Sequence, residues 1–378
     1  MKRILLLFVT LFGYLLPSLG QVTFKIDDFS DQYYGKVFIF DNTKPYCGGW
    51  VAVYDRKTNK ELIRVDADEI SYELHDNQMR SNIAEGPYGE HSVLFYSDFN
   101  FDGVKDFALM DGLHGWNHTP SFKIFLASGK GFKLSPELSE LAHGNCGIFT
   151  IDNDDKTLNT LTRGTGTWYE VSTYMIVDNK PLLVNARKED SSAPLYFTTI
   201  NNLEGDKMVE THSTTIDLDD DNVTSFLKFY VDSKLKTIIL YSLDDHTLHY
   251  AIRNEEGLVE FYYPEIAANT KTDFTYSAKS NTLKFRTKDA EYSITDTPKF
   301  AGIIITTKGK TYRWKGKTDI CHESLAALLK KTYSNVTRII LRTKKHRISK
   351  TSGRKPMPLF SMWFPPACYS IVCANDSN

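Results

Sequence analysis

Short runs of alternating apolar and polar residues cover most of the chain. The runs are rich in Val, Ile, Tyr, Phe and Thr, and turns containing Asp, Asn, Gly and Lys separate them. Typical examples are GWVAVYD at residues 49–55, LKTIILY at 235–241 and TLKFR at 282–286. Alternation of this kind, in β-branched and aromatic residues bounded by turns, is typical of half-buried strands. We therefore predict an all-β fold built from antiparallel hairpins.

One segment departs from this pattern and predicts a short helix. Asp319 can cap its N-terminus, and two lysines at 330–331 lie near its C-terminus. Between them, Leu325, Leu328 and Leu329 are spaced to share one helical face. The favourable placement of the lysines at the negative end of the helix dipole supports the same prediction.

The strand rhythm is interrupted once, by INNLEGDK near residues 201–206. This interruption predicts a first β domain over residues 21–200 and a second β module, carrying the short helix, over residues 201–340. The chain changes character at residue 341. From Arg342 onward it holds seven Lys or Arg and one acid, Asp376. We favour a poorly ordered tail over residues 341–378, with a basic surface-binding tail as the alternative.

The N-terminus has the pattern of a secretory signal peptide over residues 1–20. Lys2 and Arg3 precede an apolar stretch from Ile4 to Leu16, and small residues stand before Gln21. The apolar stretch is shorter than the ~20 residues that a membrane-spanning helix needs. We expect cleavage, a periplasmic or secreted mature chain, and no transmembrane segment within it.

Charge and cysteine content narrow the possible partners and scaffolds. The full chain has a formal charge of −2, which becomes −4 once Lys2 and Arg3 are removed. Such a balance provides no general attraction to nucleic acid, so we expect no nucleic-acid partner. The five cysteines fit no zinc-binding spacing. An oxidising compartment permits a disulfide, for example between Cys47 and Cys146, without fixing the pairing.

The strongest chemical motif is FYSDFNFDGVKDFAL at residues 95–109. Asp98, Asn100 and Asp102 stand at positions 1, 3 and 5 of a calcium loop, and Asp106 stands at position 9. The carbonyl of Val104 supplies position 7. Between them, Gly103 permits the tight turn that such a loop requires. Hard oxygen donors favour Ca²⁺ over zinc or copper. The alternative is a metal-free acidic turn held by Asx-type hydrogen bonds.

This loop does not have the context of an EF-hand. An EF-hand needs a Glu at position 12, where Leu109 stands, and the flanking residues lack a helical polar face. We expect the loop to join two strands. A second acidic segment, residues 217–222, has similar spacing without an acid at position 9, and we interpret it as a solvated turn.

A longer succession of segments resembles a known family. DFNFDGVKDFALMDG, HGWNHTPSFKIFLAS, FKLSPELSEL and KTLNTLTRGTGTWYEVSTYMIVDNKPLLV follow one another within residues 49–190. Together they resemble periplasmic calcium-binding β proteins, a family that includes immunity proteins inhibiting lysozyme-like peptidoglycan hydrolases. The loop alone is similar to the FG-GAP and VCBS repeats of β-propellers.

The resemblance implies a fold of packed antiparallel four-stranded sheets, similar to propeller blades, and a protein with no catalysis of its own. It implies that Asp98, Asn100, Asp102 and Asp106 hold calcium. It also draws attention to the GTGTWYEVSTY segment, in which Trp168 and Tyr174 become candidate partner contacts. The expected partner is a cell-wall hydrolase, inhibited when a rigid loop fills its cleft.

Two aromatic segments are candidate contact loops on the residues alone. Trp116 lies among Gly and Pro in a predicted loop, where it is either exposed or packed down. Trp168 and Tyr169 follow the glycines of GTGT, in a turn that suits either a partner contact or a plain hairpin. His114 and His118 have a zinc-like spacing, but the neighbouring Gly and Pro residues argue against the helix that this spacing needs.

The sequence contains no nucleophile elbow, phosphate-binding loop or Cys/His nucleophile pair. We therefore expect a binding protein rather than an enzyme. Two alternatives stay open: a glycan-binding or adhesive surface module that uses exposed aromatic residues, and a polysaccharide hydrolase that uses a carboxylate pair.

Overall fold

The computed structural model describes residues 20–84, 89–129, 131–164, 166–264, 273–317 and 324–339. All of them belong to one unit that ends at Ile339. The predicted signal peptide (except Gly20), the tail after residue 340, Asp319, and Cys321, Cys368 and Cys373 lie outside the described residues. Among the described helices, none is long and apolar enough to span a membrane.

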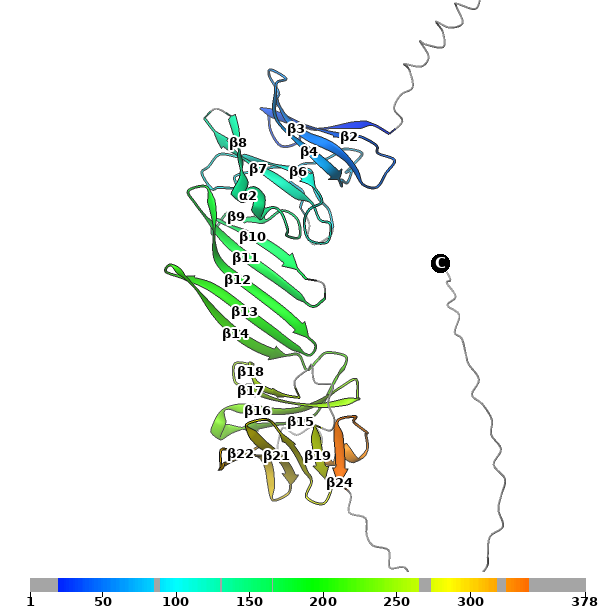
Figure 1. The fold of residues 1–378 in the computed structure, drawn as a ribbon, viewed down its shortest axis with the longest axis vertical. Helices are drawn as coiled ribbons and strands as arrows, with labels where there is room; N and C mark the ends of the chain where they lie inside the picture. The colour runs from blue at the N-terminus through cyan, green and yellow to red at the C-terminus, as the bar shows by residue number, and fades with distance from the viewer. Residues whose placement is uncertain are drawn as a thin grey trace, which may run out of the picture. The chain divides into compact units, whose positions relative to one another are not determined.

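The described chain is all-β, which confirms the predicted fold class, and its strands form five sheets (Figure 1). In the first two sheets, of four strands each, every strand pairs antiparallel with the next in the chain. Their strands are β1 (Val22–Ile26), β2 (Tyr33–Ile39), β3 (Cys47–Asp55), β4 (Glu61–Ile70), β5 (Leu94–Ser97), β6 (Asp106–Gly112), β7 (Ser121–Ser128) and β8 (Gly131–Ser135).

The third sheet contains six strands and follows a short helix, α2 (Pro136–Leu141). Ser135 caps α2 through its side chain, and Leu138 and Leu141 are the buried residues of the helix. The strands of the third sheet are β9 (Thr150–Asp152), β10 (Thr157–Arg163), β11 (Trp168–Val177), β12 (Lys180–Ser192), β13 (Leu195–Glu204) and β14 (Lys207–Ile216). Residues 205–206, within the predicted domain boundary, form the turn between β13 and β14, so hydrogen bonding continues across that position.

The last two sheets contain four and six strands. The four-stranded sheet consists of β15 (Val223–Val231), β16 (Lys236–Leu243), β17 (Thr247–Asn254) and β18 (Val259–Tyr263), with a 3-10 turn, η1 (Asp232–Lys234), after β15. The six-stranded sheet consists of β19 (Phe274–Ser277), β20 (Thr282–Arg286), β21 (Ala290–Thr297), β22 (Phe300–Thr307), β23 (Lys310–Lys315) and β24 (Val336–Ile339). β24 pairs parallel with β19.

The leucine helix is only partly as predicted. Residues Leu325–Leu329 form a 3-10 helix, η3, whose N-cap is Ser324. Leu325 and Leu328 are buried, whereas Leu329 is 44% exposed, so the predicted three-residue face is wrong. A 3-10 helix has three residues per turn, which keeps positions i and i+3 on one face and carries i+4 away from it. The sequence prediction also missed α2, which lies in the first half of the chain.

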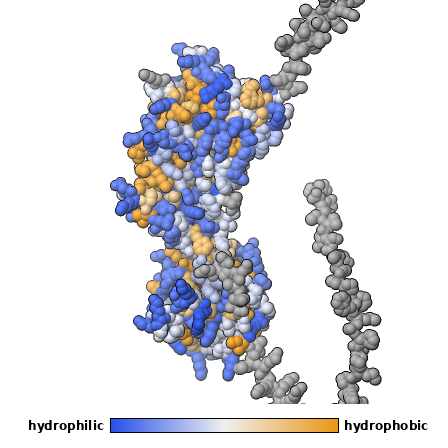
Figure 2. Space-filling model, viewed as in Figure 1, coloured by the Kyte–Doolittle hydropathy of each residue, from blue (hydrophilic) through white to orange (hydrophobic). Residues whose placement is uncertain are grey.

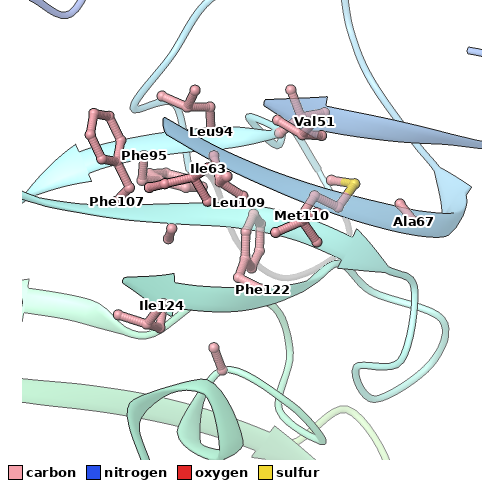
Figure 3. Close-up of a cluster of buried hydrophobic side chains, with 14 of the residues drawn as sticks. Val51, Ile63, Ala67, Leu94, Phe95, Phe107, Leu109, Met110, Phe122 and Ile124 are labelled. Carbon is pink, nitrogen blue, oxygen red and sulfur yellow. The ribbon is translucent and has the colours of Figure 1, made fainter. Parts of the chain in front are cut away.

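The largest buried cluster joins the first two sheets. Val51 and Ile63, on β3 and β4, meet Leu94, Leu109 and Phe122 of the second sheet, as Figure 3 shows. β6 is buried along its entire length, because both faces of this strand are covered, and this burial includes its two aspartates, Asp106 and Asp111. The predicted calcium loop, residues 98–106, begins and ends beside this buried cluster.

A second large cluster joins β15–β17 with β19–β22 and η3. The third sheet is less covered: only a few of its residues are buried, and Met175, Val177 and Leu182 at the β11–β12 hairpin are between 44% and 48% exposed. Figure 2 shows apolar surface over the part of the molecule that contains this sheet. Because these apolar side chains are exposed, the third sheet contributes more to the surface of the protein than to its core.

Candidate functional site

The predicted calcium loop joins β5 to β6, as its place between two strand patterns predicts. Phe101 and Gly103 both have positive φ, at 62° and 88°. The positive φ at these two residues curls the backbone, so that the oxygen-bearing side chains of the loop turn inward. Open space surrounds the Gly103 Cα, so the glycine is required by its φ and not by crowding.

The side chains of the loop face their own backbone. Asp98 accepts hydrogen bonds from the Asp102 and Gly103 N–H groups at 3.1 and 2.8 Å. Asp102 accepts one from the Val104 N–H at 2.8 Å, and Asn100 Oδ1 accepts one from the Asp102 N–H at 3.3 Å. The Val104 side chain is exposed. The backbone thus holds the oxygen atoms of positions 1, 3 and 5 on the concave side of the loop.

Asp106 lies beneath the loop and is completely buried. One of its carboxylate oxygens accepts the Phe99 N–H at 2.9 Å, and the other accepts the Ala127 N–H of β7 at 2.7 Å. Burial, with a smaller contribution from the charges of Asp102 and Asp98, raises the pKa of Asp106 to about 6, against the effect of these two hydrogen bonds. The negative charges of Asp98 and Asp102 therefore repel that of Asp106.

No lysine or arginine pairs with these three carboxylates in the described residues. Lys105, which is adjacent in sequence, lies instead over the ring of Tyr96 at 5.4 Å. An uncompensated set of hard oxygen donors on a curled loop fits a Ca²⁺ ion in chemistry and charge. The carboxylates do not converge on a single point here, because they accept the N–H groups of the loop itself. Residues Asp98, Asn100, Asp102 and Asp106, with the Val104 carbonyl, are the groups that would hold the ion.

Asn100 also links the loop to the third sheet. Its Nδ2 donates to Asn179 Oδ1 at 2.8 Å, and Asn179 lies in the two-residue turn between β11 and β12. β11 begins at Trp168, next to the GTGT turn, and ends at Val177. The loop therefore contacts the turn that follows β11, and Trp168 and Tyr169 lie at the other end of this strand, about 30 Å away at the usual rise of a strand.

Trp168 is half-buried at the β10–β11 turn. Its indole lies against Gly164, where an added Cβ would be 1.9 Å from the ring nitrogen, and the Lys188 Nζ lies 4.8 Å from the ring centre. A side chain at position 164 would collide with the indole, so Gly164 allows the Trp168 ring to lie against the backbone. Tyr169 is 37% exposed, and its hydroxyl donates to Glu189, an interaction that raises the pKa of the tyrosine.

Trp116 lies in the loop between β6 and β7, and it is half-buried. The backbone N–H of Trp116 donates to the backbone carbonyl of Asn145 at 2.8 Å. The side-chain oxygen of Asn145 accepts a hydrogen bond from the Thr162 hydroxyl of β10 at 2.6 Å. Asn145 thus ties the Trp116 loop to the end of β10 that leads into the Trp168 turn. Tyr174 is different, because it packs against the first core cluster in the middle of β11.

The two histidines of the Trp116 loop pair with different carboxylates. His114 lies 3.4 Å from Asp68, and His118 lies 2.5 Å from Glu69. The pair given as an example of a permitted disulfide is not joined: Cys47 and Cys146 are both free thiols. Cys47 belongs to β3 of the first sheet, whereas the Cys146 N–H is hydrogen-bonded to Leu161 of the third.

The structure also contains a group of donors that the sequence did not reveal. Glu73, His75 and Glu90 have donor atoms that all lie within 4.8 Å of one another. They come from an irregular segment between β4 and β5 that lacks any strand or helix periodicity. A Glu and a His two residues apart are the only sequence signal, and many chains contain such a pair without a site.

No protein-family model and no curated protein matches the chain. Several solved structures are similar to it. A Xanthomonas type IV secretion system related protein is 18% identical, covers 50% of this chain and 92% of its own, and has a TM-score of 0.40. The Pseudomonas aeruginosa periplasmic gluconolactonase is 12% identical over 78% of this chain and 85% of its own, with a TM-score of 0.21.

The β-propeller domain of the Trilobed protease from Pyrococcus furiosus is 9% identical over 79% of this chain and 98% of its own, with a TM-score of 0.23. The names of these three proteins mention neither calcium nor inhibition, so the inhibitor family remains a prediction. The fold assignment rests on the strand registers of this chain.

Proposed function

We propose that the chain is an exported, calcium-stabilised binding protein that inhibits a lysozyme-like peptidoglycan hydrolase by occluding its cleft. The observation that carries the calcium part is the β5–β6 loop, in which two left-handed residues turn three oxygen-bearing side chains inward above the buried Asp106. Ca²⁺ bound there would offset the repulsion among the carboxylates and would fix the loop to β7.

The inhibitor part is supported by the aromatic residues near the β10–β11 turn. Trp168 and Tyr169 lie at the end of a hairpin, and the Trp116 loop is tied to the same end through Asn145. Trp and Tyr residues on a rigid turn are typical anchors of protein interfaces. Calcium acts at the other end of β11, through Asn100 and Asn179, so its contribution is to hold the strand that carries the anchors.

Peptidoglycan release by a lysozyme-like hydrolase tests this function. We expect the purified protein to lower the rate of release in a saturable manner in the presence of calcium, and less so after chelation. Asp102→Ala should reproduce the effect of the chelator. Undiminished hydrolysis at a large excess of the protein, across a panel of such enzymes, would contradict inhibition. Release by the protein alone would instead favour the hydrolase alternative.

A further inference from the structure

The segment between β4 and β5 gathers three metal-binding side chains. Glu73, His75 and Glu90 bring two carboxylate oxygens and an imidazole nitrogen within 4.8 Å of one another. Glu73 is exposed, and the other two are half-buried. Among the described residues, no other group of three or more His, Cys, Asp or Glu side chains has its donor atoms this close together.

The local backbone holds the three residues together. His75 and Gln78 form an antiparallel bridge with two mutual backbone hydrogen bonds of 2.9 Å, closed by Asp76 and Asn77 at positive φ. Residues two apart in extended chain project to the same side, which places Glu73 beside His75. Glu90 directly precedes His91, which is bridged to Ala84. Two separate bridges therefore position the three donors.

Within the part of the chain that the structure describes, no ion pair with a basic side chain balances the charge of the group. None of the ion pairs in the described residues joins a lysine or arginine to Glu73 or Glu90, although their carboxylates lie within 4.8 Å of each other. Two carboxylates at this separation repel each other unless a cation or a proton lies between them. The arrangement thus provides both the ligands and the electrostatic reason for a bound cation.

We propose that Glu73, His75 and Glu90 bind a divalent transition-metal ion, with Zn²⁺ as the best fit. One imidazole and two carboxylates suit zinc better than calcium, which takes six to eight oxygen ligands. Ligands about 2 Å from a tetrahedral zinc lie about 3.3 Å apart, so side-chain rotations close the group around the ion. The three ligands leave a coordination position open.

Two of the three ligands, Glu73 and Glu90, also line a polar cavity of about 260 Å³. His91, and Asn117 and His118 of the Trp116 loop, line the same cavity. Since His118 is held by Glu69 and by an edge contact with Tyr46, its part of the cavity wall is fixed. The zinc ion would therefore present its free position to a small anionic or carbonyl-bearing ligand, or to a side chain of a partner.

This site is independent of the calcium loop, which uses residues 98–106 and only oxygen donors. The test is titration of the chelator-treated, purified chain with ZnCl₂ by calorimetry, followed by Co²⁺ absorption spectroscopy. We expect about one Zn²⁺ per chain in addition to any calcium. His75→Ala and Glu90→Gln should each weaken zinc binding at least tenfold, and Asp102→Ala should leave it unchanged.

His246→Ala is the matched control, since His246 is an exposed histidine in the turn between β16 and β17. Circular dichroism verifies that each variant is folded, which is expected because His75 and Glu90 are only half-buried and lie outside the strands. Absence of zinc binding by the wild type overturns the proposal. So does zinc binding that His75→Ala and Glu90→Gln leave unchanged, because the ion would then be held elsewhere.

Discussion

At the scale of single residues, the proposed contact depends on Trp168. Its indole covers Gly164 and is itself approached by Lys188, so the ring is held in place yet partly exposed. A pre-positioned aromatic side chain loses little conformational entropy when a partner covers it. Tyr169 is anchored through its hydroxyl to Glu189, on the neighbouring strand β12.

We predict that Trp168→Ala weakens binding to the hydrolase by about thirtyfold, which corresponds to ~2 kcal/mol for an aromatic anchor. The melting temperature should change little, because the side chain is only half-buried. Tyr169→Phe is the control, since it keeps the ring and removes only the hydroxyl. Equal inhibition by wild type and Trp168→Ala would exclude this turn as the contact.

We expect His249 to make the stability of the protein sensitive to acid. His249 is buried against the ring of Tyr241 and shares a 2.9 Å hydrogen bond with Thr247. Burial lowers the pKa of His249 to about 4, against the opposing charge of Asp273. Because the folded pKa lies below the unfolded value of about 6.5, the stabilisation is complete above pH 6.5 and is lost progressively as the pH falls from about 6.5 to about 4.

We therefore expect His249 to remove up to about 3 kcal/mol of unfolding free energy between pH 7 and pH 4, at 1.36 kcal/mol per pKa unit. Urea denaturation of the wild type and of His249→Phe, at both pH values, isolates this contribution from other titrating groups. The variant should lose less stability than the wild type on acidification. Identical losses would show that His249 does not titrate between these limits.

At the scale of secondary-structure elements, β24 pairs with β19 of the last sheet, and one buried side chain next to it reaches the neighbouring sheet. Asn335 precedes β24, and its amide exchanges two 2.9 Å hydrogen bonds with the Leu248 N–H and carbonyl of β17. Its own carbonyl accepts the Asp273 and Phe274 N–H groups. A single residue thus joins β24 to two sheets.

Asn335→Ala should destabilise the protein by about 2–3 kcal/mol, because it leaves the Leu248 N–H and carbonyl buried without partners. The neighbouring Ser334→Ala removes only an exposed hydroxyl and serves as the control. The measurement is the urea midpoint of the transition. Equal shifts of the urea midpoint in the two variants would show that the Asn335 hydrogen bonds to Leu248 do not stabilise the protein.

How much the sequence predicts also differs between elements. The strands and the β5–β6 loop follow from local patterns, since alternation and the position of Gly103 act within a few residues. The 3-10 geometry of Leu325–Leu329 does not, because the same leucine spacing fits an α-helix until packing decides between them. The Glu73–His75–Glu90 group could not be predicted for a different reason: Glu90 is fifteen residues or more from the other two, and only the fold of the irregular segment brings it beside them.

At the scale of the whole molecule, the described elements end with β24, and residue 340 begins a second unit. We expect a chain that ends at Ile339 to keep its melting temperature within a few degrees, since every strand of the five sheets is retained. A chain that ends at Tyr333 loses both Asn335 and β24, and should unfold at a clearly lower temperature. Loss of soluble protein on truncation after Ile339 would contradict this expectation.

The central claim is that one calcium ion stabilises the molecule at the β5–β6 loop. A ligand that binds the folded state alone stabilises it by about 2.7 kcal/mol at 100 times its Kd. Calorimetric titration of the chelator-treated protein with CaCl₂ tests this most directly. The result we expect is one tightly bound calcium per chain, lost in Asp102→Ala and retained in Asp219→Ala, which alters an acidic turn elsewhere. A wild-type titration without binding heat, together with a melting temperature that is the same in calcium and in chelator, would contradict the claim.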